Sequence, residues 1–348
     1  MTALRIRFVL RETVSQLFLI IQCLETMGET PIVFFYDRYD RKENILPNNK
    51  TKSRTKNSTK NKKELFYEEM QRLITDKKPD DMEVDFRPVT KQNRKNLHAV
   101  TLSKPGSAAA PTFYLEDLYQ AYLDGTAPDD MAESLIRFAL ENNMQAPPGN
   151  IQIEDYESVR KNLGLIVIGE ERNREYLSDL IYEKIEDLAL LPIIFTNDSY
   201  GTGNIKIKRT CLSLWNVSEE TVLKEAKENA PNLMPLTFRQ LGDLVGEESV
   251  NEEELFVLSN SFFAAGAAVI FYPHVLSCIG NALGKDLFLL PSSVNEMIIL
   301  TDCGQDPETL LKIVKEVNRT QVVESEQLTD AVYHYSREKD HFKRLLPA

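Results

Sequence analysis

The sequence predicts an α+β protein in which helices pack on a mainly antiparallel sheet. Apolar residues at helical spacing alternate along the chain with short apolar runs that are typical of strands. Short turn segments containing Gly, Pro or Ser separate neighbouring strands, and the C-terminal third has the order β-β-α-β-β-α. The 348 residues are 42% hydrophobic and 27% charged, which excludes collagen-like, coiled-coil and wholly disordered classes.

The N-terminal region is basic. The first 63 residues hold 13 Lys and Arg against 6 Asp and Glu, so the remainder of the chain carries a net charge of -19. We expect residues 1–49 to form a short extension, with a helix at 8–24 and a strand at 32–36. Residues 50–63 contain seven cations and neither an acidic nor an apolar residue, which predicts a disordered linker.

This basic linker has three interpretations. It contacts nucleic acid through its cations, it is a solvated tether, or it derives from upstream coding sequence outside the native protein. Nucleic-acid binding depends on this segment, because the acidic remainder repels phosphate. The linker contains no aromatic residue that would stack on a base, which argues against the first interpretation.

The first part of the predicted α+β body covers residues 64–190. It is predicted to begin with a helix, a strand and a helical hairpin, and the second helix of the hairpin starts at Asp130. A strand buried on both faces follows. The last element is a helix that carries Asp179, Glu183 and Asp187 on its solvated side. The expected ranges are, in order, 63–75, 97–103, 113–123, 130–141, 164–169 and 175–188.

The second part of the body covers residues 191–340. It begins with a hairpin of strands 191–196 and 204–209, and a helix that starts after Ser218 and ends at Pro231 follows. The β-β-α-β-β-α unit then closes the body, and Asp306 and Pro307 mark the start of its last helix. Its expected ranges are 255–260, 267–272, 273–283, 287–290, 296–301 and 307–317.

Several strings within residues 64–340 resemble an uncharacterised bacterial family, a domain of unknown function found in anaerobic Gram-positive bacteria. They include VLSNSFFAAGAAVIFYPHVL (257–276), LGKDLFLLPSSVNEMIIL (283–300) and EVNRTQV (316–322), which contain the patterns LPSSxxE and EVNxTQV. The resemblance implies a cytoplasmic protein and the extent of its fold, but no reaction, substrate or cofactor. The family pattern often has His at the position of Asn295, which argues against catalysis there.

Two polar clusters are candidate binding residues. Ser292, Ser293, Asn295 and Glu296 lie in a predicted turn between two strands, where a hydroxyl, an amide and a carboxylate meet. The second cluster follows the last helix and consists of Asn318, Thr320 and Gln321, which we expect to line a groove with the first. A serine nucleophile needs a base within hydrogen-bond distance, and none is close in sequence, so no catalytic residue is assigned. The alternative is an ordinary turn and a helix C-cap.

The sequence contains few histidines and cysteines that could bind a metal ion. Four histidines are too few for a multi-histidine metal site. His274 and Cys278 lie four residues apart on a predicted helix and form either half a metal site or a Cys-His pair, unless Cys278 faces the core. The four cysteines are far apart, so we expect no disulfide framework, no zinc site and a reducing, cytoplasmic location. No metal, cofactor or membrane association is predicted.

Three hypotheses about function follow. The one we favour is a non-enzymatic cytoplasmic binding or regulatory module, with a protein as a candidate partner. The second is a hydrolase-like enzyme with a site near residues 292–296 and 318–321. The third is nucleic-acid contact through residues 50–63. The sequence leaves the identity of the ligand and the oligomeric state open.

Overall fold

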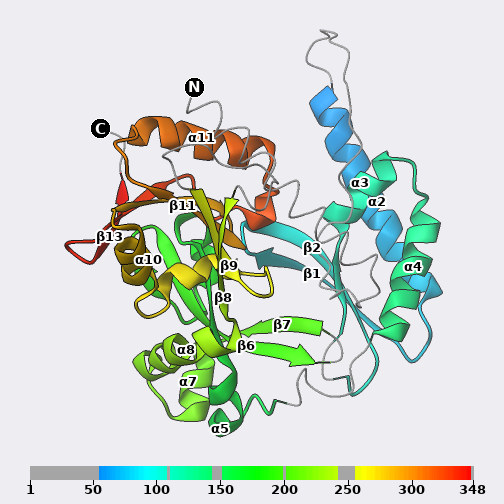
Figure 1. The fold of residues 1–348 in the computed structure, drawn as a ribbon. Coiled ribbons are helices and arrows are strands. Elements are labelled where there is room, and N and C mark those ends of the chain that lie inside the picture. The colour runs from blue at the N-terminus through cyan, green and yellow to red at the C-terminus, as the bar shows by residue number, and fades with distance from the viewer. Residues whose placement is uncertain (1–54, 108–109, 143–150, 199–200, 242–254, 346–348) are drawn as a thin grey trace. The chain divides into compact units, whose positions relative to one another are not determined.

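The computed structural model describes residues 55–107, 110–142, 151–198, 201–241 and 255–345 (Figure 1). The predicted extension at 1–49, with its helix and strand, lies outside them. The chain divides into an N-terminal unit, Val33–Asn150, and a C-terminal unit that contains Ile151–Ala348. The α+β class is confirmed in both units. The division expected at residues 190 and 191 falls inside a strand of the C-terminal unit.

The N-terminal unit is a three-stranded antiparallel sheet with three helices. The strand order is β1-β2-β3, and the helices pack on the face that carries Val100 and Leu102 of β2. The predicted helices and the strand at 97–103 are present, whereas β1 and β3 were not predicted, and β3 takes the first two residues of the helix expected at 113–123. The elements are α2 (Thr55–Lys77), β1 (Glu83–Lys91), β2 (Arg94–Ser103), β3 (Thr112–Tyr114), α3 (Leu115–Leu123) and α4 (Pro128–Glu141).

Helices α2 and α4 start earlier in the chain than predicted. Helix α2 begins at Thr55, so the second part of the predicted disordered linker is helical. Phe66 and Met70 anchor the helix in the core, and extending an anchored helix costs much less than nucleating one. Helix α4 begins at Pro128 rather than after Asp130, because the fixed φ angle of proline suits the first turn of a helix.

The C-terminal unit contains two antiparallel sheets. In the six-stranded sheet the order is β13-β12-β10-β11-β9-β8. In the four-stranded sheet, β6 pairs with β4 on one edge and with β5 and β7 on the other. The strands are β4 (Leu163–Gly169), β5 (Glu183–Ile185), β6 (Leu188–Asp198), β7 (Gly201–Lys206), β8 (Leu236–Gln240), β9 (Leu255–Asn260), β10 (Leu287–Ser293), β11 (Glu296–Thr301), β12 (Val332–Ser336) and β13 (His341–Leu345).

Helices cover both faces of the six-stranded sheet. Helix α11 (Pro307–Thr320) packs its buried stripe on the face that carries Ile298 and Leu300, as Figure 1 shows. The opposite face, which carries Met297 and Ile299, packs in the largest core of the unit. The other helical segments of the unit are α5 (Tyr156–Val159), η2 (Arg160–Asn162), η3 (Glu171–Asn173), α6 (Arg174–Leu177), α7 (Thr210–Trp215), α8 (Glu219–Leu233), η4 (Gly266–Phe271), α10 (Val275–Leu283) and η5 (Glu324–Glu326).

The helix predicted at 175–188 is wrong. Helix α6 ends at Leu177, and the chain then forms β5, turns at Glu186 with a φ of 56°, and enters β6. The backbone N–H and C=O groups are bonded here by strand pairing rather than by a helix. The apolar spacing that resembled a helix therefore reflects the burial of side chains in a hairpin. The expected solvated carboxylate face does not exist: Glu183 pairs with Lys227, and Asp187 accepts a hydrogen bond from the Tyr333 hydroxyl (2.7 Å).

The strand predicted at 267–272 is also wrong, because these residues form the 3-10 helix η4. Every residue from Gly266 to Ile270 is buried, and a short, wholly apolar run does not distinguish a buried strand from a buried helix. The unit therefore runs β9-η4-α10-β10-β11-α11, followed by β12 and β13, which were not predicted. Helix α8 also continues past Pro231, to Leu233.

Candidate functional site

The predicted serine turn joins β10 to β11, with Ser293 paired opposite Glu296. Ser292 and Glu296 are buried, and the Ser292 hydroxyl donates a hydrogen bond to Glu296 Oε1 (2.8 Å). Alternate residues of a strand share a face, so Glu296 lies on the same face as Ile298, towards α11. The hydroxyl and the carboxylate thus meet as the sequence predicted, in the interior of the unit.

Burial controls the ionisation of Glu296. Removal from water raises the pKa of this carboxyl to about 7, the hydrogen bond from Ser292 opposes the rise, and the negative charge of Glu326 adds to it. A carboxyl that titrates near neutral pH is a feature of general acids and bases, and also of buried structural groups.

Ser293 and Asn295 hold the turn to a neighbouring loop. The Ser293 hydroxyl accepts a hydrogen bond from the Asn295 backbone N–H (3.0 Å). Asn295 Oδ1 accepts one from the Ala265 backbone N–H (2.9 Å), and its carbonyl oxygen accepts one from the Ser259 hydroxyl (2.7 Å). Asn295 therefore links the hairpin turn to the loop after β9.

That loop, residues 261–265, has an unusual backbone. Phe263 and Ala265 have φ angles of 51° and 53°, in the left-handed region that residues other than glycine rarely adopt. The buried Asn260 holds the loop, because its Oδ1 accepts the Phe262 N–H (3.0 Å) and its amide donates to the Ala264 carbonyl (2.8 Å). Backbone strain of this kind persists only where surrounding contacts enforce it, and it is common at functional sites.

Gly266 is required by close packing at the end of the loop. A Cβ atom at this position would lie 2.2 Å from Ser259 Oγ and 2.5 Å from the Asn295 carbonyl oxygen. Only glycine allows the loop to approach the hairpin turn this closely.

The second predicted cluster, at the end of α11, is only partly assembled. Asn318 is buried and donates hydrogen bonds to the Thr329 carbonyl (3.0 Å) and to Asp330 Oδ1 (2.8 Å). Thr320 donates to the carbonyl of Glu316 one turn earlier, and the Gln321 N–H bonds to Val317. Thr320 and Gln321 thus bond to their own helix.

One segment, residues 324–330, connects the two clusters. The Val294 N–H of the serine turn donates to the Glu326 carbonyl (2.8 Å), and the Gln327 side chain donates to the Asn318 carbonyl (2.8 Å). The structure therefore brings Ser292, Glu296 and Asn318 to one region through this segment. Whether the seven predicted residues bind a ligand stays a prediction.

Strand β8, which the sequence did not predict, forms an edge of the six-stranded sheet. In an antiparallel pair of strands, residue pairs that exchange backbone hydrogen bonds alternate with pairs that do not. The Ser261 N–H donates to the Pro235 carbonyl (2.8 Å), so hydrogen bonds recur at every second residue of β8 from Pro235 onward. The backbone groups of Thr237 and Arg239 therefore face β9, whereas those of Leu236 and Phe238 point to the opposite side. None of the described strands pairs with that side of β8.

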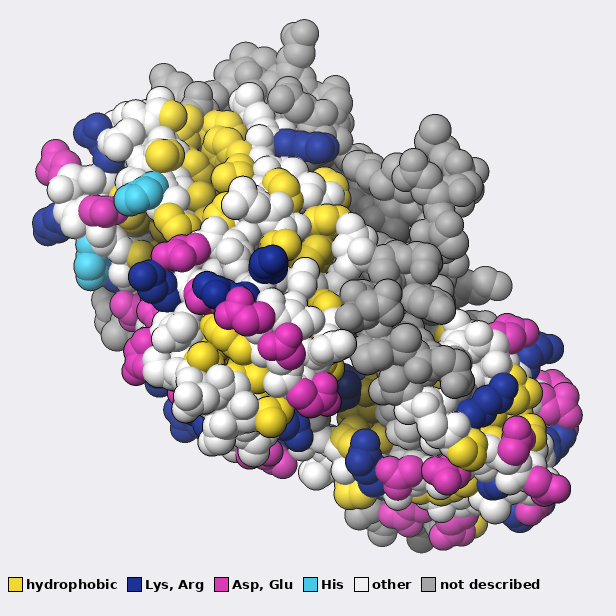
Figure 2. All heavy atoms as spheres, turned by 90° about the horizontal axis from the view of Figure 1, so that it is seen from below, with side chains coloured by type: hydrophobic (Ala, Val, Ile, Leu, Met, Phe, Trp, Pro, Cys, Tyr) yellow, Lys and Arg dark blue, Asp and Glu magenta, His cyan; other side chains and the backbone are white. Residues whose placement is uncertain are grey.

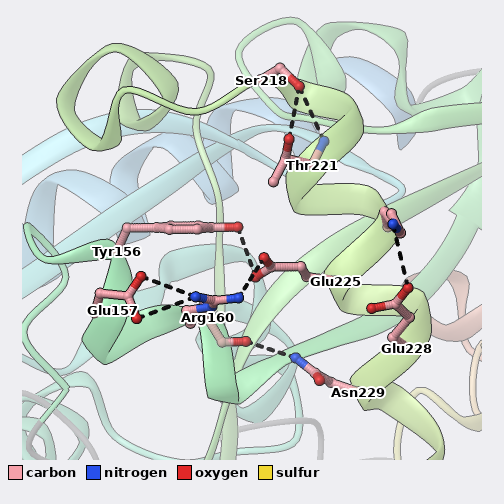
Figure 3. Close-up of polar contacts among 9 residues, drawn as sticks. Tyr156, Glu157, Arg160, Ser218, Thr221, Glu225, Glu228 and Asn229 are labelled. Carbon is pink, nitrogen blue, oxygen red and sulfur yellow. Dashed lines mark hydrogen bonds and ion pairs between the residues drawn. The ribbon is translucent and has the colours of Figure 1, made fainter.

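Figure 3 shows a separate polar cluster that fastens α5 and η2 to α8. Glu225 accepts hydrogen bonds from the Tyr156 hydroxyl and from Arg160 (3.0 Å each), and Asn229 donates to the Arg160 carbonyl. Burial, with the nearby Glu225 charge, raises the pKa of Tyr156 to about 12. Arg160 also pairs with Glu157, so the charges are paired within the cluster, which stabilises the packing of these helices.

The predicted His274–Cys278 pair does not form a metal site. Cys278 is exposed rather than facing the core, and its backbone N–H donates to the His274 carbonyl. Among the residues that the structure describes, no group of three or more His, Cys, Asp or Glu side chains is arranged to hold a metal ion. In the same part of the chain, no helix has the length and apolar character required to span a bilayer.

Comparison with known proteins gives one match. A family model described as a family of unknown function (DUF5688) matches residues 63–337. No curated protein and no solved structure matches the chain. The matched range contains every residue of the serine turn, the loop after β9 and strand β8.

Proposed function

The chain belongs to the family of unknown function DUF5688, and we propose that it is a non-enzymatic binding module that takes an extended segment of a partner protein along the open edge of β8. The observation that supports this proposal is the outward direction of the Leu236 and Phe238 backbone groups. Such an edge offers N–H and C=O groups in the spacing that an added strand requires.

The side chains around this edge suit protein recognition. Leu236 is 44% exposed, and the Arg239 guanidinium lies over the ring of Phe263, 5.6 Å from its centroid. Phe262 and Phe263 are half-buried in the loop after β9. Aromatic and arginine side chains are enriched at protein interfaces, and an extended peptide gains specificity from side chains that flank the added strand.

The serine turn supports this edge in the proposal. Ser259, Asn260 and Asn295 fix the loop that presents Phe263 beside Arg239. Ser292 and Glu296 are buried beneath α11, where they stabilise the turn that carries Asn295. Recognition surfaces bind more tightly when the supporting residues hold them in one conformation.

The test is a selection of extended peptides of about eight residues from a random library, followed by affinity measurements on variants of the full chain. Leu236→Pro removes one outward N–H and leaves the bonds between β8 and β9 in place, so we expect at least a tenfold loss of affinity. Leu236→Ala is the matched control, because it keeps the N–H and loses only the side chain. Equal affinity for both variants would exclude strand addition at β8.

A second copy of the chain is the alternative occupant of this edge. It predicts a concentration-dependent dimer in light scattering, which Leu236→Pro dissociates and Leu236→Ala preserves. That result would replace the partner protein with self-association.

The enzyme hypothesis has one supporting observation, the pKa of Glu296 near 7, which suits a general acid or base. The Ser292 hydroxyl already donates a hydrogen bond to this carboxylate, and Ser292 is 1% exposed. Turnover of a generic ester or phosphate substrate that disappears in both Ser292→Ala and Glu296→Gln, with the fold intact, would favour the enzyme over the binding module.

Nucleic-acid contact through residues 50–63 remains a prediction. On the face of the molecule in Figure 2, the described Lys and Arg side chains lie among acidic ones rather than in a broad basic area. Binding through the basic segment predicts an affinity that falls steeply with salt and is lost when residues 1–63 are deleted. The cytoplasmic location is likewise a prediction, which localisation of a tagged full chain tests.

A further inference from the structure

Five polar or aromatic side chains of the N-terminal unit lie together between α2, β2 and α3. Lys63 and Tyr67 are four residues apart on one face of α2, His98 comes from β2, and Glu116 and Tyr119 come from α3. The cluster is separate from the serine turn and from β8, which belong to the other unit.

The aromatic rings of this cluster already hold a cation. The Lys63 ammonium lies 5.5 Å from the centroid of the Tyr67 ring and 5.9 Å from that of Tyr119. The two rings are nearly perpendicular, with centroids 6.5 Å apart, and the His98 ring lies 4.6 Å from that of Tyr67. Two ring faces that converge on one ammonium are the geometry of a cation–π site.

The Tyr67 and Tyr119 hydroxyls are both buried in the cluster. Each residue is 7% exposed; the Tyr67 hydroxyl lies beside the Glu116 carboxylate, whereas the Tyr119 hydroxyl has no hydrogen-bond partner in the described part of the chain. Buried polar groups are nearly always hydrogen-bonded, so an unpaired one calls for a specific explanation. A phenolic oxygen accepts a hydrogen bond as readily as it donates one, and a ligand with N–H groups would satisfy both.

The charge of the cluster favours a cation over an anion. Burial alone would raise the pKa of Glu116, but hydrogen bonds from the His98 ring and backbone outweigh it and hold the pKa below its usual value. Glu116 is therefore ionised. Burial first, then the negative charge of Glu116 and a hydrogen bond to its carboxylate, and then the charge of Asp117, raise the pKa of Tyr67. The potential at the Tyr67 oxygen is negative, which attracts an ammonium group and repels a carboxylate or a phosphate.

We propose that this cluster is a binding site for a primary alkylammonium group, and that Lys63 is its intramolecular occupant, displaced when the ligand binds. The ligand's N–H groups donate to the Tyr67 and Tyr119 hydroxyls, the ring faces contact the cation, and Glu116 supplies the opposite charge. Lys63 is half-buried, and its ammonium sits on a flexible four-carbon stem that moves to solvent without disturbing α2.

Calorimetric titration of the full chain tests the site with defined probes. n-Butylammonium chloride represents a free amine, and N-acetyl-lysine methylamide represents a lysine side chain of a protein. Removing the internal competitor in Lys63→Ala is expected to strengthen the binding of both about tenfold. Lys62→Ala, which removes an exposed neighbouring cation, is the matched control and is expected to leave the affinity unchanged.

A second set of variants tests the ligand's chemistry. Glu116→Gln is expected to abolish binding, whereas Tyr122→Phe, whose ring stacks on Phe66 outside the proposed contacts, is expected to retain it. Circular dichroism verifies that each variant is folded. Should Glu116→Gln fail to fold, the comparison of Lys63→Ala with Lys62→Ala still decides the matter.

The outcomes separate two sources of the ligand. Equal binding of both probes supports a free amine, and tighter binding of the lysine probe supports a lysine of another protein. Tetramethylammonium, which lacks N–H groups, is expected to bind more weakly than n-butylammonium. The proposal is overturned if neither probe binds Lys63→Ala, if Lys62→Ala strengthens binding equally, or if sodium acetate or inorganic phosphate binds instead.

Discussion

Glu116 is half-buried and Glu296 is buried, and their carboxyls ionise in opposite ways. Glu116, at the start of α3, accepts hydrogen bonds from the backbone N–H and the ring of His98, and its pKa is lowered. Glu296, at the start of β11, accepts one from Ser292 within the described residues, and burial raises its pKa to about 7. The depth of burial and the number of donors that meet a carboxylate together decide whether desolvation or hydrogen bonding controls its charge.

The difference separates the roles of the two regions. An ionised carboxylate beside aromatic rings, and near a hydroxyl that has no partner among the described residues, has charge available for a ligand, as the Glu116 cluster has. A carboxyl that is neutral over part of the physiological pH range is tolerated in a closed interior, where Glu296 packs beneath α11. The following substitutions test this distinction, from the largest expected effect to the smallest.

Gly266→Ala is expected to reduce the free energy of unfolding by about 3 kcal/mol, because its Cβ would overlap Ser259 and the Asn295 carbonyl, which have little freedom to move. Urea denaturation measures the loss. Gly164→Ala is the control, since the nearest atom there is the Met234 sulfur at 3.3 Å, on a flexible side chain. A similar, small effect for both would show that the region around Glu296 is loosely packed.

Glu296→Gln is expected to remove a pH dependence of stability. The folded pKa of about 7 exceeds the ordinary value of 4.5, so the folded state holds its proton more tightly. In the wild-type protein, the contribution of Glu296 to the free energy of unfolding is therefore fully present below pH 4.5. It falls by about 3 kcal/mol as the pH rises through 7. Denaturation midpoints between pH 4 and 8 measure the slope. An unchanged slope in Glu296→Gln would contradict the raised pKa.

Glu116→Gln is expected to have the opposite pH signature. Because the folded pKa is lowered, the stabilisation from Glu116 is present above the ordinary pKa and disappears as the pH falls through the folded value. We expect a loss of about 1 kcal/mol at pH 7, discounted for partial exposure, and no loss in strong acid. The same denaturation series measures it. A loss that persists at low pH would show that packing rather than charge is responsible.

Tyr119→Phe is expected to change stability by less than about 0.5 kcal/mol, because its hydroxyl has no partner among the described residues. Tyr333→Phe is the matched comparison: its buried hydroxyl bonds to Asp187 and Thr329, and the loss should be about 2 kcal/mol. Thermal melts of the two variants measure the difference. Equal losses would indicate that the Tyr119 hydroxyl is already paired in the free protein.

Local sequence signals predicted much of the fold. Asp306 caps α11 by accepting the Glu308 and Thr309 N–H groups, and Ser218 caps α8 by accepting that of Thr221, as expected. Such caps depend on residues within one turn. The predictions at 175–188 and 267–272 failed because apolar spacing records burial, whereas the choice between strand and helix there depends on pairing with β6 and packing at Gly266.

The candidate sites also differ in how far local sequence predicts them. Ser292 and Glu296 are four residues apart across a tight hairpin, so their pairing was predictable. The cluster around Glu116 combines residues from three elements, and Tyr119 carried only the signal of an inward helical stripe. The end position of β8 among the described strands follows from strand order, which no local pattern encodes.

Residue-resolved amide hydrogen exchange on the free full chain is the most direct test of the proposed binding edge. Thr237 and Arg239, whose N–H groups bond to β9, should exchange slowly, whereas Leu236 and Phe238 should exchange rapidly and gain protection when a selected peptide binds. Slow exchange of all four amides in the free protein would mean that the edge is already covered, and would contradict strand addition at β8.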